Sequence, residues 1–208
     1  MTTTQPTDIL KAEHRVIEQV LSCLEKLAEA SLQEGKLPGQ AARDTINFFR
    51  DFADRCHHGK EESHLFPLLE SKGFSREHGP TGVMLDEHQQ GREHIRVMDG
   101  ALEAASAGDP GALQDFVAHA RAYAELLRQH IHKEDECLFP MANQALSNAE
   151  QQALLSAFVE VESDEMEEGL HEKYLQLADE LARRYGVPPA AAETPEILAQ
   201  AGCMHYGR

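Results

Sequence analysis

The chain has 208 residues, the length of one large domain or of one domain with an appendage. Hydrophobic residues make up 41% of it, which is enough to bury a core, and the net charge of −17 argues against a nucleic-acid or anionic-membrane surface. Because 12 histidines accompany 36 acidic residues, the composition suggests divalent metal as a compensating charge.

Apolar residues recur with helical spacing along most of the chain, and no stretch alternates with the period of two that strands show. Glycines and prolines divide the pattern into five amphipathic stretches near residues 8–34, 40–71, 82–107, 110–146 and 148–186. Short connections between the first four predict an all-α fold, an up-down-up-down four-helix bundle with an additional C-terminal helix and a tail. We expect the bundle over residues 1–146, the additional helix packed on it over 147–186, and the tail over 187–208.

The first and third helices carry the same core-facing seam. Apolar positions separated by four and three residues run through 10–28 in the first helix and through 84–102 in the third. His14 and His88 occupy the second place of these seams, and a glutamate precedes each of them.

The second and fourth helices also match each other. One contains HHGKEESHLFP and the other HIHKEDECLFP. Superposing the two LFP triplets aligns His57 with His130 and Glu61 with Glu134. The chain therefore consists of two copies of one unit, and we expect approximate twofold symmetry in the folded bundle.

The repeat predicts a metal centre in the bundle interior. Each H-x-x-x-E motif places an imidazole and a carboxylate one turn apart on the same helix face. A lone core histidine is more often a hydrogen-bonded core residue than a ligand, but recurrence at matched offsets favours ligation. Buried carboxylates are costly unless they are paired or coordinated, and a donor set of nitrogen and oxygen suits iron or manganese better than zinc. The candidate metal ligands are His14, His57, Glu61, His88, His130 and Glu134.

Over roughly residues 8–146 these motifs resemble the hemerythrin-like (HHE cation-binding) family, bacterial type. The resemblance implies two non-haem iron ions with an oxo or hydroxo bridge, held by the six candidate ligands, with Glu61 and Glu134 as bridging carboxylates. The oxygen-carrying hemerythrins of invertebrates have a further histidine one turn past the third-helix ligand, where this chain has Arg92. The missing ligand leaves more room for water or an exogenous diatomic molecule.

Polar residues beside the motifs are expected outside the centre. His58 and Glu62 each follow a candidate ligand by one residue, a step that turns a side chain by about 100° on an α-helix. We expect both on the helix surface or behind the ligands. His64 and Cys137 lie three residues past the two glutamates, and we interpret them as packing or supporting residues.

Other histidines and the fifth helix offer weaker candidates. Glu168 and His171 stand three residues apart and could reach a metal, but the acidic sequence around them favours a solvated face. Five histidines without a matched partner are expected to be exposed or capping: His78, His94, His119, His132 and His205.

The leading functional interpretation is a di-iron protein that binds O2, NO or peroxide for sensing, storage or stress defence. The alternatives are an enzyme at the same site, with catalase- or peroxidase-like or nitric oxide reducing activity, an iron donor for iron–sulfur cluster repair, and a protein with a structural metal. Bacterial repair proteins of the family carry an additional N-terminal cysteine-bearing module, which we do not expect here. Whether the protein is an enzyme stays open, as do a redox partner and the oligomeric state.

The sequence also predicts the compartment. No apolar run approaches the roughly 20 residues that span a bilayer. The polar N-terminus lacks the basic and apolar regions of a secretory signal, and the four cysteines form no CxxC pair. We therefore expect a reduced, cytoplasmic protein with no nucleic-acid or membrane partner.

Overall fold

The computed structural model describes residues 4–165 and 170–190, and within these ranges the regular structure is entirely helical. The all-α prediction is therefore confirmed for the described part of the chain. None of the described helices is both long and apolar enough to span a membrane.

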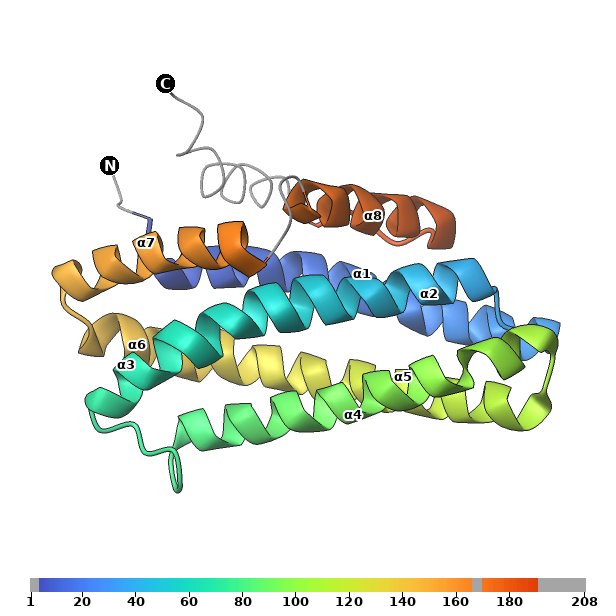
Figure 1. Cartoon of the computed structure of the whole chain (residues 1–208), viewed down its shortest axis with the longest axis horizontal. Helices are drawn as coiled ribbons and strands as arrows, with labels where there is room; N and C mark the ends of the chain where they lie inside the picture. The colour runs from blue at the N-terminus through green and yellow to red at the C-terminus, as the bar shows by residue number, and fades with distance from the viewer. Residues whose placement is uncertain (1–3, 166–169, 191–208) are drawn as a thin grey trace.

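Four long helical runs lie side by side (Figure 1), and short turns join consecutive runs. The second and fourth runs each pass without a break through α-helical and π-helical segments. In chain order the runs comprise α1 (Pro6–Glu34); α2 (Gly39–Phe48), η1 (Phe49–His58), η2 (Glu61–Leu65) and α3 (Phe66–Ser71); α4 (Pro80–Ala107); and α5 (Pro110–Lys133), η3 (Glu134–Leu138) and α6 (Phe139–Ala145).

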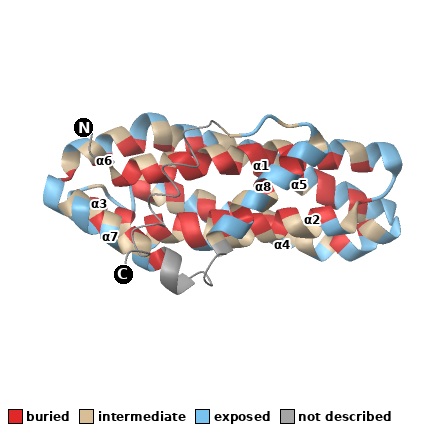
Figure 2. Ribbon diagram, turned by 90° about the horizontal axis from the view of Figure 1, so that it is seen from above, coloured by how far each residue is buried: buried red, intermediate tan, exposed pale blue. Residues whose placement is uncertain are grey.

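The helical runs end near the glycines and prolines that the sequence analysis took as helix breakers. Gly35 and Gly108 end α1 and α4 with φ of 67° and 94°, the left-handed conformation that glycine adopts without steric cost. Asp109 then caps α5 by accepting a hydrogen bond of 2.7 Å from the amide of Ala112. Buried residues, red in Figure 2, line the faces of the runs that are turned toward one another.

The π-helical segments are a difference from the regular helices that the sequence predicted. Both η2 and η3 begin at a motif glutamate and end at the leucine of an LFP triplet. Pro67 and Pro140 follow in the next turn, and neither has an amide hydrogen to continue the α-helical bonding pattern. A π-turn is wider than an α-turn, so it changes which side chains share a face, and such turns often occur at functional sites.

Two further helices cover the side of the bundle formed by α1 and the second run. The residues expected as one helix over 148–186 are described as α7 (Asn148–Glu165) and α8 (Leu170–Tyr185). α7 contacts α1, η1 and η2, and α8 contacts α1 and α2. The hydroxyl of Tyr174 donates a hydrogen bond to Asp51, which ties α8 to the second run.

Candidate metal centre

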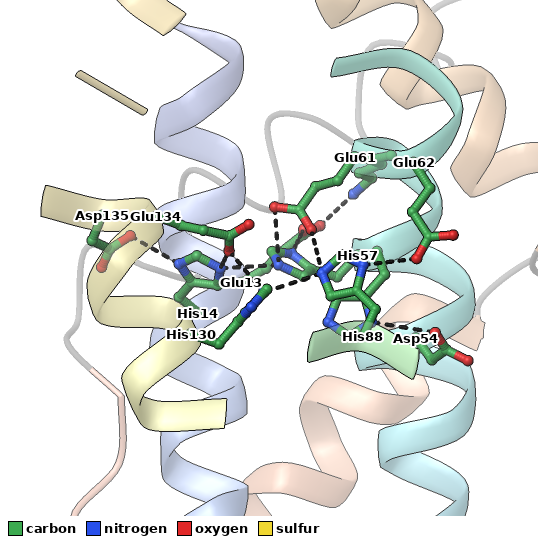
Figure 3. Close-up of polar contacts among 12 residues, drawn as sticks. Glu13, His14, Asp54, His57, Glu61, Glu62, His88, His130, Glu134 and Asp135 are labelled. Carbon is green, nitrogen blue, oxygen red and sulfur yellow. Dashed lines mark hydrogen bonds and ion pairs between the residues drawn. The ribbon is translucent and has the colours of Figure 1, made fainter. Parts of the chain in front are cut away.

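The six side chains that the repeat singled out come together in the interior, and each is at most 1% exposed (Figure 3). Both glutamates lie at the first residue of a π-turn. The positions are His14 on α1, His57 in η1, Glu61 in η2, His88 on α4, His130 on α5 and Glu134 in η3.

The first cluster consists of His14, His57, Glu61 and Glu134, whose candidate ligand atoms all lie within 4.8 Å of one another. The Nε2 atoms of His14 and His57 are 3.0 Å apart. Glu134 Oε2 lies 3.2 Å from His14 Nε2, and Glu61 Oε1 lies 3.7 Å from His57 Nε2. One cation can therefore be reached by two imidazoles and two carboxylates.

The second cluster consists of His58, Glu61, His88 and His130, again with ligand atoms within 4.8 Å of one another. His88 Nε2 lies 3.1 Å from His130 Nε2 and 3.5 Å from Glu61 Oε2. Glu134 Oε2 is also close, 3.3 Å from His130 Nε2. Glu61 thus presents one oxygen to each cluster, and Glu134 Oε2 lies near histidines of both, which is the arrangement of bridging ligands.

The expectation that His58 lies on the helix surface is wrong, and His58 is among the candidate ligands of the second cluster. Its ring is 5% exposed and stacks on His88, with centroids 3.7 Å apart and planes inclined by 13°. The expectation assumed the 100° step of an α-helix. Residues 49–58 instead form η1, so consecutive side chains are turned differently and both His57 and His58 face the centre.

All five histidines share one orientation. In each ring, Nδ1 faces a carboxylate oxygen, which only accepts hydrogen bonds, so Nδ1 carries a proton. That leaves Nε2 as the nitrogen that could donate a lone pair to a metal, as in metal-bound histidines. The five pairs are His14 with Asp135 (2.8 Å), His57 with Glu13 (2.9 Å), His58 with Asp54 (3.2 Å), His88 with Glu62 (2.7 Å) and His130 with Glu87 (3.0 Å).

Basic side chains hold these supporting carboxylates in turn. Lys60 donates to Glu13 and Lys133 donates to Glu87, and the two lysines occupy matching places in the repeat. The lysines were visible in the motifs HHGKEE and HIHKED, but the sequence alone did not show which acids they bind. The lysine–glutamate pairs behind the histidines therefore recur in both copies of the repeat, as the candidate ligands do.

Arg92 binds two supporting carboxylates at once. Its guanidinium lies 2.9 Å from Asp54 and 2.6 Å from Glu62. These acids orient His58 and His88, so one arginine positions two histidines of the second cluster. Arg92 thus acts on the centre through the carboxylates.

The donor set fits a pair of cations. All four oxygens of Glu61 and Glu134 are buried and receive no hydrogen bond, a costly state for carboxylates. The Nε2 atoms of His14 and His57 lie 3.0 Å apart and those of His88 and His130 lie 3.1 Å apart, close enough for each pair to share one cation. A cation in each cluster would offset the cost of the buried carboxylates, and the mixture of imidazole and carboxylate without thiolate is typical of iron and manganese sites.

The pKa values in the metal-free centre differ between the two glutamates. Burial, and then the charge of Glu134, raise the pKa of Glu61 well above 4.5. Burial acts to raise the pKa of Glu134, but His130 and His14 together outweigh it and hold that pKa well below 4.5. Burial acts to lower the pKa of His130, but the Glu134 and Glu87 carboxylates together outweigh it and raise that pKa to about 9. Metals that enter must displace these protons, so their binding depends on pH.

Two cavities approach the second cluster from the side of Arg92. The inner one, about 120 Å³, reaches the rings of His58 and His88 and is also lined by Tyr123. A side chain at Gly91 would intrude there, since an added Cβ would lie 3.3 Å from the Tyr123 ring. The outer cavity, about 600 Å³, lies between η1, η2 and α7, and Arg92 lines both.

The remaining candidates lie away from the clusters. Cys137 is exposed, contrary to the expected packing role, because three residues along a π-turn do not return to the face of Glu134. His64 lines the outer cavity. His171 packs beside Phe52, with ring centroids 5.3 Å apart, and belongs to neither cluster. Glu168 and His205 lie outside the described residues.

Comparison with known proteins agrees with this centre. The family model described as the hemerythrin HHE cation binding domain matches residues 5–142. Uncharacterized proteins of Mycobacterium tuberculosis and Mycobacterium bovis are 24% identical over 192 residues, which cover 92% of this chain and 74% of theirs. No solved structure matches the chain.

Proposed function

The chain belongs to the hemerythrin HHE cation-binding family, and we propose that it is a non-haem di-iron protein that binds a small diatomic or oxidant, namely O2, NO or peroxide. One observation carries this proposal. Four buried carboxylate oxygens, those of Glu61 and Glu134, lie among five imidazoles and receive no hydrogen bonds. In this proposal residues 1–146 are an up-down-up-down four-helix bundle, 147–186 the covering helices and 187–208 a tail.

The proposed ligand set is asymmetric. His14 and His57 would hold the first iron, and His58, His88 and His130 would hold the second, with Glu61 and Glu134 available to both. The first position has one protein ligand fewer. Two iron ions would supply the electrons and the open coordination position for that molecule.

The protein's own residues prepare the site for such chemistry. Burial keeps bulk water from the centre, and the carboxylates on Nδ1 fix the proton on the outer nitrogen of each histidine. The inner cavity has the volume to hold a diatomic molecule beside the centre. These features support binding, storage, sensing or defence in a reduced, cytoplasmic setting, with electrons from a redox partner where turnover occurs.

Metal analysis combined with an optical spectrum of the aerobically purified protein tests the proposal. We expect two irons per chain and a near-ultraviolet charge-transfer band. O2, NO or peroxide is then added to the reduced form. A stable spectral change indicates a binding protein, whereas continued consumption of peroxide or NO indicates the enzyme alternative. Failure of the iron-supplied protein to retain two ions would contradict the di-iron assignment.

The role of His58 gives a separate prediction. His58→Ala is expected to lower the affinity for the second iron at least about tenfold, because it removes one of three imidazoles at that position. Equilibrium metal titration measures the change, and the charge-transfer band of the iron pair should fall with it.

His64→Ala is the matched control, since His64 lies in the same run but lines the outer cavity. It should retain both irons. If His58→Ala retains both irons with wild-type affinity and spectrum, the histidine ligands are only the four that the repeat predicted.

A further inference from the structure

A third pair of facing histidines lies outside the centre, between α4 and α5. His94 and His119, both half-buried, come from neighbouring helices, and their Nδ1 atoms are 3.0 Å apart. The sequence predicted both as exposed or capping residues without a partner. The structure instead brings them together across 25 residues of sequence.

The mutual geometry of this pair resembles that of the two internal pairs. Its ring centroids are 5.1 Å apart and its planes are inclined by 59°. The corresponding values are 4.6 Å and 59° for His14 with His57, and 4.7 Å and 59° for His88 with His130. The facing nitrogens are separated by 3.0 to 3.1 Å in all three pairs.

This separation suits joint coordination of one cation. Two nitrogens 3.0 Å apart, each about 2.0–2.1 Å from a shared zinc ion, subtend an angle of about 95° at the metal. Burial and the charge of His119 lower the pKa of His94, so its ring is neutral and able to donate a lone pair at neutral pH. The net charge of −17 also favours the approach of a cation.

We propose that His94 and His119 form a separate surface site for one borderline divalent cation, Zn²⁺ or Cu²⁺, with water completing the coordination. The internal centre adds bridging carboxylates to its imidazoles, which suits iron. The surface pair offers nitrogen alone, which suits zinc and copper. Because it is half-exposed, it exchanges its ion with solvent while the buried centre keeps its own.

The test is a titration of the iron-loaded protein with Zn²⁺ against a chromophoric chelator, with iron measured in the same samples. We expect one zinc per chain in addition to the iron. His94→Ala and His119→Ala should each weaken zinc binding at least about tenfold. His132→Ala is the control, because His132 is an exposed histidine on α5. It should bind zinc as the wild type does.

A second readout distinguishes ligation from a general effect of charge. With Cu²⁺, electron paramagnetic resonance should show two coupled imidazole nitrogens in the wild type and one in either single variant. The alternative is that one ring simply donates a hydrogen bond to the other. Wild-type zinc affinity in both variants, equal weakening by His132→Ala, no additional zinc, or zinc that displaces iron would each overturn the proposal. Apart from displacement of iron, none of these outcomes bears on the di-iron centre.

Discussion

Replacing Glu61 with alanine is expected to reduce the metal content of the purified protein from two ions per chain to fewer than one. Glu61 presents one oxygen to each cluster, so its loss removes a ligand from both positions together. The remaining histidines keep their Nε2 atoms close together without this carboxylate between them. Metal analysis of the iron-supplied variant measures the effect, and circular dichroism should show that the chain remains helical.

Glu136→Ala is the matched control for this experiment. Glu136 is an exposed glutamate in η3, two residues after Glu134, and its side chain belongs to neither cluster. It should retain both ions. Two irons retained by Glu61→Ala would show that Glu61 does not bridge the pair.

Removing the metals from the wild-type protein is expected to lower its melting temperature. A metal at 1,000 times its dissociation constant stabilises the folded state by about 4 kcal/mol, provided that it does not bind the unfolded chain. The metal-free protein also keeps two buried carboxylates close together, with no hydrogen bonds to them. Melting curves before and after chelation measure the difference.

Glu61→Gln separates the cost of charge from the loss of metal. The raised pKa of Glu61 means that the folded metal-free protein keeps a proton that the unfolded chain loses above about pH 4.5. Glu61 therefore lowers the stability of the metal-free wild type as the pH rises from 4.5 to the raised pKa. The variant cannot ionise there, so in chelator it should melt above the metal-free wild type, by a margin that grows over this range.

Two results would contradict this account of the carboxylates. One is a wild-type melting temperature that chelation leaves unchanged. The other is a metal-free Glu61→Gln protein that melts below the metal-free wild type at neutral pH. Either would mean that Glu61 is well accommodated without a cation.

The spacing of apolar residues predicted the helical class. The repeat predicted six site residues, because each of them has a partner at a matched offset in the other copy. It did not identify His58, whose place depends on the π-helical geometry of η1. The clue that was present is Asp54, four residues earlier, which can hold the outer nitrogen of that ring. We predicted regular helices across both LFP triplets, although the proline of each triplet cannot donate its amide.

Contacts between side chains on different helices could not be predicted from the sequence for a different reason. The pairing of His94 with His119 depends on the relative register of α4 and α5, which spacing within one helix does not determine. The same holds for Arg92, whose two carboxylates both lie on the second run.

The recurrence of the same π-turn in both halves bears on how the fold arose. Glu61–Leu65 and Glu134–Leu138 begin at equivalent glutamates and precede equivalent prolines, so the distortion belongs to the repeating unit itself. A homodimer of that unit would place identical side chains at both metal positions. Fusion of the two copies removes this constraint, and His58 in one copy stands opposite Ile131 in the other. A chain that carries both copies can therefore place different numbers of histidines at the two clusters.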